Sequence, residues 1–240
     1  LAFFGCSFTY GWGVEDTETF PYLVQKELSN FKVENYSVPG YGTIQALQQI
    51  RHIPADKFPK TVVLVYGSFH DHRNGLSLAQ RKFWSTSVTN QDANPAYSHI
   101  QFPCLENANS HEISFIPSNQ LYEPCKWCKK LATINFIENY SYRITDSKRQ
   151  LPTISLQIIE KINHLVKRHN SRLIVAGILD NEETALFLNQ LKEKGVECID
   201  ISVNTENPDY NLLPFDEHPN ALAHEKYAQT FLKFFHSNSL

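Results

Sequence analysis

The sequence predicts an α/β fold, a three-layer α/β/α sandwich with a central parallel sheet, in a single domain over residues 1–240. Short apolar runs that end in glycine or a polar turn recur along the chain, as buried parallel strands do. Segments with apolar residues at helical spacing lie between these runs. Strand and helix therefore alternate, which is the pattern of a parallel sheet covered by helices on both faces.

The first third of the chain holds three of the predicted strands. LAFFG at the start is a short apolar run that glycine ends, and FKVENY is a second short strand before a Pro-Gly turn. TVVLVYG is the clearest strand, because it is continuously apolar, rich in β-branched residues and ended by glycine. Helices are expected over residues 20–28, with Thr19 as a candidate cap, and over residues 43–53.

Periodicity weakens between about residues 74 and 150, where Pro, Asn, Ser and aromatic residues dominate. Such a stretch predicts a long irregular insertion, which we expect over the top face of the domain. Beyond it, an amphipathic helix is expected around Ile154–Val166. Asp180 and Glu183 have the spacing of a capping box for a later helix. The remaining expected elements are strands at 172–179 and 196–201, the capped helix up to Gly195, and a last helix over 219–235.

Composition and charge exclude several classes of protein. Of the 240 residues, 42% are hydrophobic and 20% charged, as in a globular protein. The net charge of −3 comes from scattered residues without a basic run, so nucleic-acid binding, which needs a clustered basic surface, is not expected. No apolar stretch approaches the length of a membrane span.

The five cysteines are too few and too uneven for a disulfide framework. Cys125 and Cys128 form a lone C-x-x-C, which cannot complete a four-ligand zinc site, and no redox-type strand and helix surround it. We expect a local disulfide or two thiols there. No metal and no cofactor are predicted.

Residues that could take part in catalysis follow the predicted strands. In parallel sheets, ligands bind outside the carboxyl ends of the strands. Ser7 follows the first strand and Gly40 the second. His70 and Asp71 follow the third strand, and the segment DEHPN at 216–220 follows the last. These residues are therefore expected at one edge of the sheet.

Ser7 is a candidate nucleophile. A serine hydroxyl needs an imidazole to take its proton, and the imidazole needs a carboxylate to orient it. His218 and Asp216 supply both groups from one loop. The oxyanion of an attacked carbonyl needs preorganised N–H donors, and the amides of Ser7 and Gly40 are candidates because glycine lets backbone approach a substrate closely.

Over nearly its whole length the chain resembles the SGNH, or GDSL-type, hydrolase superfamily, with four motifs in the family's order. GCSFTYGWG is similar to the first block, which implies that Ser7 is the nucleophile. NYSVPGYG resembles the second block, with Gly40 as the oxyanion glycine, and VYGSFHDHRN stands where Gly-x-Asn-Asp is expected. DEHPN resembles the fifth block, with Asp216 and His218 completing a triad. The resemblance implies an α/β/α sandwich and an esterase, lipase or carbohydrate deacetylase without a metal.

Three positions depart from the family pattern. Cys6 replaces the usual aspartate beside the nucleophile, which we interpret as a structural change. His70 replaces the oxyanion asparagine; an imidazole N–H can donate, but its donor depends on the tautomer, and loss of one donor typically costs about 100- to 1,000-fold in rate. The chain has Asp-Glu-His in place of Asp-x-x-His. Either it uses a shorter form, or a residue is absent between Glu217 and His218, which would fit the lack of methionine.

The expected function is that of a serine esterase or acylhydrolase that cleaves or transfers an acyl group, such as acetyl, on a carbohydrate or small ester. Two alternatives stay open. A catalytically impaired SGNH-fold protein would bind a ligand, with His70 marking the decay of the oxyanion hole. A metal-dependent hydrolase would use ligands from the two segments HDH (70–72) and DEH (216–218), but it leaves Ser7 and Gly40 unexplained.

Aromatic residues near these motifs are candidates for an acyl or sugar pocket: Trp12, Tyr41, Phe69 and Trp84. Phosphate binding by the glycines around Trp12 is weakly supported, because both the G-x-G-x-x-G and the P-loop spacing are missing. The insertion is expected to shape substrate choice.

Other residues are assigned supporting roles. His72 and His224 are expected at the surface or behind the site, and Asp71 is expected to cap or brace its loop. Because many relatives are exported or anchored, the resemblance implies a location outside the cytoplasm. The sequence does not predict an oligomeric state.

Overall fold

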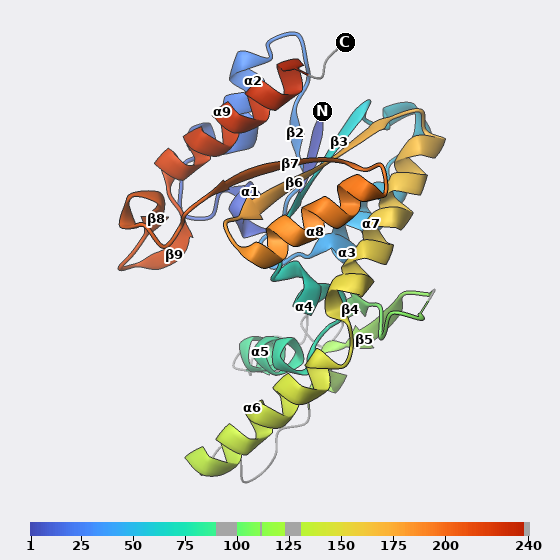
Figure 1. Ribbon diagram of the computed structural model, residues 1–240, viewed down its shortest axis with the longest axis vertical. Helices are drawn as coiled ribbons and strands as arrows, with labels where there is room; N and C mark the ends of the chain where they lie inside the picture. Colours follow the sequence, from blue (N-terminus) through green and yellow to red (C-terminus); the bar gives the residue numbers. More distant parts are fainter. Residues whose placement is uncertain (90–99, 111, 123–130, 238–240) are drawn as a thin grey trace. The chain divides into compact units, whose positions relative to one another are not determined.

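The computed structural model describes residues 1–89, 100–110, 112–122 and 131–237. Its chain forms two compact units (Figure 1): Leu1–His70 together with Ile158–Leu240, and Asp71–Gln157. The residues predicted for the candidate site all belong to the first unit: Ser7, Gly40, His70, Asp216 and His218.

The first unit is built on a five-stranded sheet in which all neighbouring strands are parallel. The central strands are continuously apolar and almost wholly buried, as expected when helices cover both faces of a sheet. Phe3 pairs with Val63, and Val63 pairs with Ile174 on the next strand. The strand order is β2 (Glu34–Asn35), β1 (Ala2–Phe4), β3 (Thr61–Tyr66), β6 (Arg172–Leu179) and β7 (Glu197–Val203).

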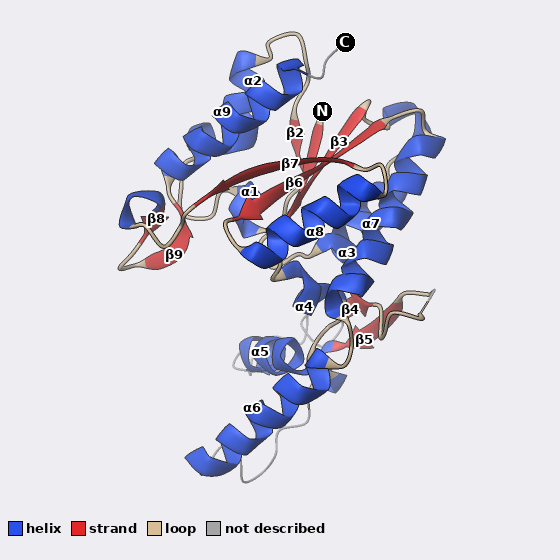
Figure 2. Cartoon of the chain, viewed as in Figure 1, coloured by secondary structure: helices blue, strands red, loops and turns tan. Residues whose placement is uncertain are grey.

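Helices α2 (Phe20–Glu27) and α9 (Ala221–Ser237) cover one face of this sheet (Figure 2). The Phe3 ring lies edge-on to the rings of Phe20 and Phe231, with 5.3 Å between centroids in each pair. Apolar side chains of α9 recur at helical spacing and face inward, as the sequence predicts.

The other face packs against α3 (Thr43–Arg51), α8 (Glu182–Glu193) and the part of α7 (Leu151–Arg168) that belongs to this unit. Tyr66 of β3 stacks on Phe187 of α8, with 4.3 Å between ring centroids. Leu188 packs against Gly177, where an added Cβ would lie 2.6 Å from its Cδ1. The three layers confirm the predicted fold class.

One local prediction in this unit is wrong. Asp180 and Glu183 do not form the capping box of α8, because the helix begins one residue later than that pattern requires. Asn181 is the N-cap, and its side chain accepts a hydrogen bond of 2.9 Å from the Thr184 amide. The chain also forms the short helices α1 (Ser7–Tyr10), η1 (Asp16–Glu18), η2 (Ala55–Lys57) and η5 (Pro208–Tyr210), and an antiparallel pair of strands, β8 (Asn211–Leu212) and β9 (Asp216–Pro219).

The second unit is entered through α4 (His70–Asn74) and left through the start of α7. It has a small core of Leu76, Cys104 and Leu121, against which Trp84 packs. Its other elements are α5 (Leu78–Thr89), α6 (Ala132–Ser147), η4 (Ser118–Gln120) and an antiparallel pair of strands, β4 (Gln101–Cys104) and β5 (Ser114–Pro117).

The helices of the second unit were not predicted from the sequence. In α6 the large apolar residues Phe136 and Ile137 are 72% and 64% exposed. Cys125 and Cys128 lie outside the described residues. The single domain with an insertion at about 74–150 stays a prediction. None of the described helices has the length and apolar character needed to cross a membrane.

Candidate active site

Ser7 lies at a sharp passage from strand to helix. β1 ends at Phe4, Gly5 follows, and Cys6 is the extended N-cap of α1, which begins with Ser7. A side chain at Gly5 would collide with Thr9, so the turn requires glycine at this position. Cys6 is buried, in agreement with a structural role, and Ser7 is 7% exposed. The backbone thus holds the Ser7 hydroxyl at the carboxyl end of β1.

Hydrogen bonds connect Ser7 with His218, 211 residues further along the chain, and His218 with Asp216. The Ser7 Oγ lies 2.8 Å from His218 Nε2, and His218 Nδ1 hydrogen-bonds to Asp216 Oδ1. The His218 amide also donates to Asp216 Oδ1, at 2.8 Å. Side chains at positions i and i+2 of a strand share one face, so the short Asp-Glu-His spacing on β9 allows this contact.

Hydrogen bonds stabilise the ionised form of Asp216. The hydrogen bond from the His218 side chain is the largest cause of a lowered Asp216 pKa, and the His218 amide and the Trp12 side chain lower this pKa further. Asp216 is therefore ionised at neutral pH. A carboxylate facing Nδ1 keeps the proton of a neutral imidazole on that atom, which leaves Nε2 as the acceptor that faces Ser7.

Aromatic rings surround the imidazole of His218. Phe8 approaches it edge-on, with 5.4 Å between centroids, and Trp12 lies 6.2 Å away. Gly13 has φ of +84°, and a side chain there would collide with Leu212 of β8. The turn at Trp12–Gly13 thus packs against the β8–β9 pair that carries His218. Trp12 contacts the residues of the candidate site itself, and it is also 48% exposed.

Two backbone groups proposed as oxyanion donors lie on neighbouring segments. The amide of Ser7 starts α1, where amides have no acceptor within the helix. Gly40 has φ of +82°, a conformation that favours glycine. Its turn is fixed to the first strand end by the Val38 amide, which donates to the Gly5 carbonyl at 3.3 Å. Tyr41 is half-buried in the same turn, and its amide donates to the Val38 carbonyl.

His70 is buried at the start of α4, with 1% of its surface exposed. Its Nδ1 lies 3.4 Å from the Thr43 Oγ1, on the helix that follows the Gly40 turn. Its ring is edge-on to Phe69, with 4.8 Å between centroids, and Phe69 in turn lies 5.5 Å from Phe8. A chain of contacts therefore joins His70 to the residues around His218.

Contacts in three dimensions add residues that the sequence did not identify. Phe8 and Thr43 were not predicted, although Phe8 follows the candidate nucleophile directly and Thr43 opens a predicted helix. Tyr41 and Phe69 lie in the turn after Gly40 and beside His70, whereas Trp84 packs in the core of the second unit.

His224 occupies only one of its two expected kinds of position. It is wholly buried in α9, so the surface position is wrong, and a position behind the site stays a prediction. Positions 224, 227 and 231 share one face of the helix, which turns His224 toward the core. Its Nδ1 accepts a hydrogen bond from the Phe20 amide at 3.1 Å, and burial lowers its pKa to about 4.

Two further polar residues belong to the second unit. His72 is exposed, with its Nδ1 3.0 Å from the Ser77 Oγ, as the surface expectation predicts. Asp71 is buried and accepts a hydrogen bond from the Ser155 hydroxyl, so it braces α4 as expected. Over the described ranges 1–89, 100–110, 112–122 and 131–237, no three His, Cys, Asp or Glu side chains gather into a group that could hold a metal ion.

Comparison with known proteins bears on the fold. No protein-family model matches the chain, and no curated protein matches it. A member of the lipolytic protein G-D-S-L family from Veillonella parvula aligns with a TM-score of 0.52 at 12% identity, over 98% of this chain and 97% of that one. TesA aligns with a TM-score of 0.53 at 12% identity, over 98% and 96%.

A carbohydrate esterase is also among the solved structures that share this fold. An active-site mutant of a family two carbohydrate esterase from Clostridium thermocellum aligns with a TM-score of 0.52 at 11% identity, over 99% of this chain and 63% of that one. The chain therefore has the SGNH, or G-D-S-L, hydrolase fold, which it shares with a lipolytic protein of the G-D-S-L family, TesA and a carbohydrate esterase. At these identities the likeness defines the fold and leaves the substrate open.

Proposed function

We propose that the protein is a serine hydrolase that cleaves or transfers the acyl group of a carboxylic ester, with Ser7, His218 and Asp216 as its catalytic residues. The observation that carries the proposal is the hydrogen bond of 2.8 Å between Ser7 Oγ and His218 Nε2, in a histidine whose Nδ1 faces Asp216. A base within this distance of the hydroxyl can take its proton.

In the first half of the reaction, Ser7 Oγ attacks the carbonyl carbon while its proton passes to His218 Nε2. Asp216 stabilises the imidazolium that forms. The amides of Ser7 and Gly40, with His70 as a third donor, hydrogen-bond to the oxyanion. The carbon–oxygen bond to the alcohol then breaks, and His218 returns the proton to the leaving alkoxide, which leaves an acyl group on Ser7.

In the second half, His218 removes a proton from water, or from an acceptor hydroxyl, as that oxygen attacks the acyl group. The tetrahedral intermediate collapses, the bond to Ser7 Oγ breaks, and the proton returns from His218 to Ser7. Water gives hydrolysis and an acceptor alcohol gives transfer.

We propose as substrate an acyl ester, such as an acetyl ester, of a carbohydrate or small alcohol. The solved structures that share the fold support this class, since they include a carbohydrate esterase as well as lipolytic proteins. A location outside the cytoplasm remains part of the proposal. The alternative is an impaired protein that only binds its ligand, and the replacement of the oxyanion asparagine by His70 is the observation that favours it.

Covalent labelling tests the proposal without knowledge of the substrate. The protein is incubated with a fluorophosphonate, its intact mass is measured, and the modified peptide is mapped. We expect a single adduct on Ser7, and we expect His218→Ala to slow labelling by at least 100-fold because the base is lost. No adduct, or an adduct on another serine, would favour the ligand-binding alternative.

A further inference from the structure

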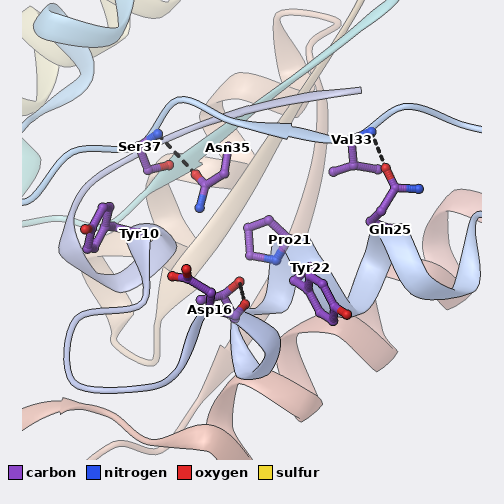
Figure 3. Close-up of a pocket in the computed structure, with 9 residues that line it drawn as sticks. Tyr10, Asp16, Pro21, Tyr22, Gln25, Val33, Asn35 and Ser37 are labelled. Atoms are coloured by element: carbon purple, nitrogen blue, oxygen red, sulfur yellow. Dashed lines mark hydrogen bonds between the residues drawn. The ribbon is translucent and has the colours of Figure 1, made fainter.

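A pocket of about 340 Å³ opens in the first unit among α1, η1, α2 and β2 (Figure 3). This volume is at the lower end of the range of about 300–1,000 Å³ for small-molecule sites. Its lining contains none of the residues proposed above for catalysis. Because it lies wholly within the first unit, its walls are defined independently of the second.

Aromatic and acidic groups form much of its wall. Tyr10 and Tyr22 are 50% and 45% exposed, and Asp16 supplies a carboxylate. Among the described residues that line the pocket there is no Lys, Arg or His. Aromatic rings pack on the apolar faces of a bound molecule while their hydroxyls reach its polar groups. A carboxylate accepts hydrogen bonds from hydroxyl groups. This combination suits a neutral, hydroxyl-rich ligand.

The hydroxyl group of Ser37 also indicates a ligand, independently of the aromatic and acidic groups. It is 5% exposed, it lines the pocket, and in the described part of the chain its Oγ has no hydrogen-bond partner. Buried hydroxyls in folded proteins nearly always have a partner, so this one points to a group supplied by a ligand. Figure 3 shows Ser37 beside Asn35 on the same wall.

Asn35 is held in a defined orientation toward the pocket. Its Oδ1 accepts a hydrogen bond from the Ser37 amide, and its Nδ2 donates to the Thr9 carbonyl, both at 3.1 Å. One N–H and one lone pair of the amide remain for a ligand. The pocket therefore offers donors as well as acceptors, which adjacent hydroxyls of a sugar use together and an ammonium ion does not.

The pocket shares a helix with the candidate nucleophile. Tyr10 is the last residue of α1 and Ser7 is its first, so one helical turn separates them. Thr9, which accepts the hydrogen bond from Asn35, lies on the same turn. A ligand seated between Asn35 and Tyr10 would contact the helix that holds Ser7.

We propose that this pocket binds a sugar ring, which stacks on the tyrosines and hydrogen-bonds through its hydroxyls to Asp16, Asn35 and Ser37. That this sugar belongs to the substrate rests on the proposed function. That a sugar binds here does not rest on it, because the pocket and the proposed catalytic residues are separate groups.

Saturation-transfer NMR and calorimetry on the full chain test the proposal with D-glucose, D-xylose, N-acetylglucosamine and cellotriose as probes. We expect at least one to bind with a Kd in the millimolar range. Ser37→Ala and Asp16→Asn should each weaken this Kd at least fivefold, whereas Ser7→Ala and Tyr140→Ala, an exposed tyrosine of the second unit, should leave it unchanged.

Folding effects are separated by thermal denaturation. Since the Ser37 hydroxyl has no described partner, Ser37→Ala should keep or raise the Tm while it weakens binding. Absence of sugar binding up to 100 mM, or binding that ignores both pocket variants, overturns the proposal. Binding of tetramethylammonium in place of the sugars would make this a cation site. Sugar binding without Ser7-dependent ester turnover would support the sugar site and refute the proposed function. Ser7-dependent ester turnover without sugar binding would refute the sugar site and support the proposed function.

Discussion

Replacing Asp216 by asparagine tests how the proposed catalytic residues work together. The carboxylate accepts hydrogen bonds from the His218 side chain and the His218 amide, and Trp12 also contributes one. Asparagine has nearly the same shape, but its NH2 group can face Nδ1 only if Nδ1 is the acceptor. The proton then lies on Nε2, and His218 no longer accepts the proton of Ser7.

The expected loss of kcat follows from this change of tautomer. In a Ser-His-Asp triad the same substitution lowers kcat about 10,000-fold, and at about 1.36 kcal/mol per tenfold this is about 5 kcal/mol of transition-state stabilisation. The fold should change little, because the Asp216 side chain is 35% exposed. KM should stay within a few-fold, since no ligand contact is removed.

The assay is steady-state hydrolysis of p-nitrophenyl acetate, with circular dichroism to check the fold. Glu217→Gln is the matched control, because it removes the neighbouring exposed carboxylate, and kcat should stay within twofold. If Asp216→Asn keeps more than a tenth of the wild-type kcat, or if Glu217→Gln loses as much activity, the proposed role of Asp216 is wrong.

Three further predictions concern His70, His224 and Gly13. His70→Ala should lower kcat/KM about 100- to 1,000-fold, the cost of one oxyanion donor, whereas His70→Asn should stay within tenfold of wild type; an unchanged kcat/KM in His70→Ala would exclude this role. His224 has its pKa lowered from 6.5 to about 4, so the free energy of unfolding should be fully present above pH 6.5 and fall by about 3 kcal/mol as pH drops to 4. Urea titrations should show this fall in the wild type and not in His224→Gln; equal slopes would contradict it. Gly13→Ala should lower the free energy of unfolding by about 1–3 kcal/mol, because φ is +84° and the new methyl meets Leu212, and a Tm equal to that of the wild type would refute this packing.

Much of the first unit could be predicted because its signals are local. Strands β3 and β6 are continuous apolar runs rich in β-branched residues, which are typical of a sheet buried on both faces. The helices of the second unit were missed, because Pro, Asn and Ser between residues 74 and 150 were interpreted as an irregular insertion. The cap of α8 was misplaced because Asp180 and Asn181 are both good N-cap residues, and only the backbone path decides between them.

The candidate site could be predicted in outline, because a parallel sheet gathers residues that follow its strands. This rule places Ser7 at the carboxyl end of β1. Asp216 and His218 were expected in a loop after the last strand, but they lie on β9 of a separate antiparallel pair, from which His218 reaches Ser7. Contacts made through space could not be predicted, such as the hydrogen bond of Trp12 to Asp216 or the proximity of Thr43 to His70. The pocket of Figure 3 was also missed, since its walls come from four different elements.

The most direct test of the central claim is ester turnover by the wild type beside Ser7→Ala, with Ser29→Ala, an exposed serine, as the control. We predict that p-nitrophenyl acetate hydrolysis by Ser7→Ala falls to background, while Ser29→Ala hydrolyses at the wild-type rate. Equal rates in the wild type and Ser7→Ala would contradict the account, because the hydroxyl beside His218 would then take no part in the reaction.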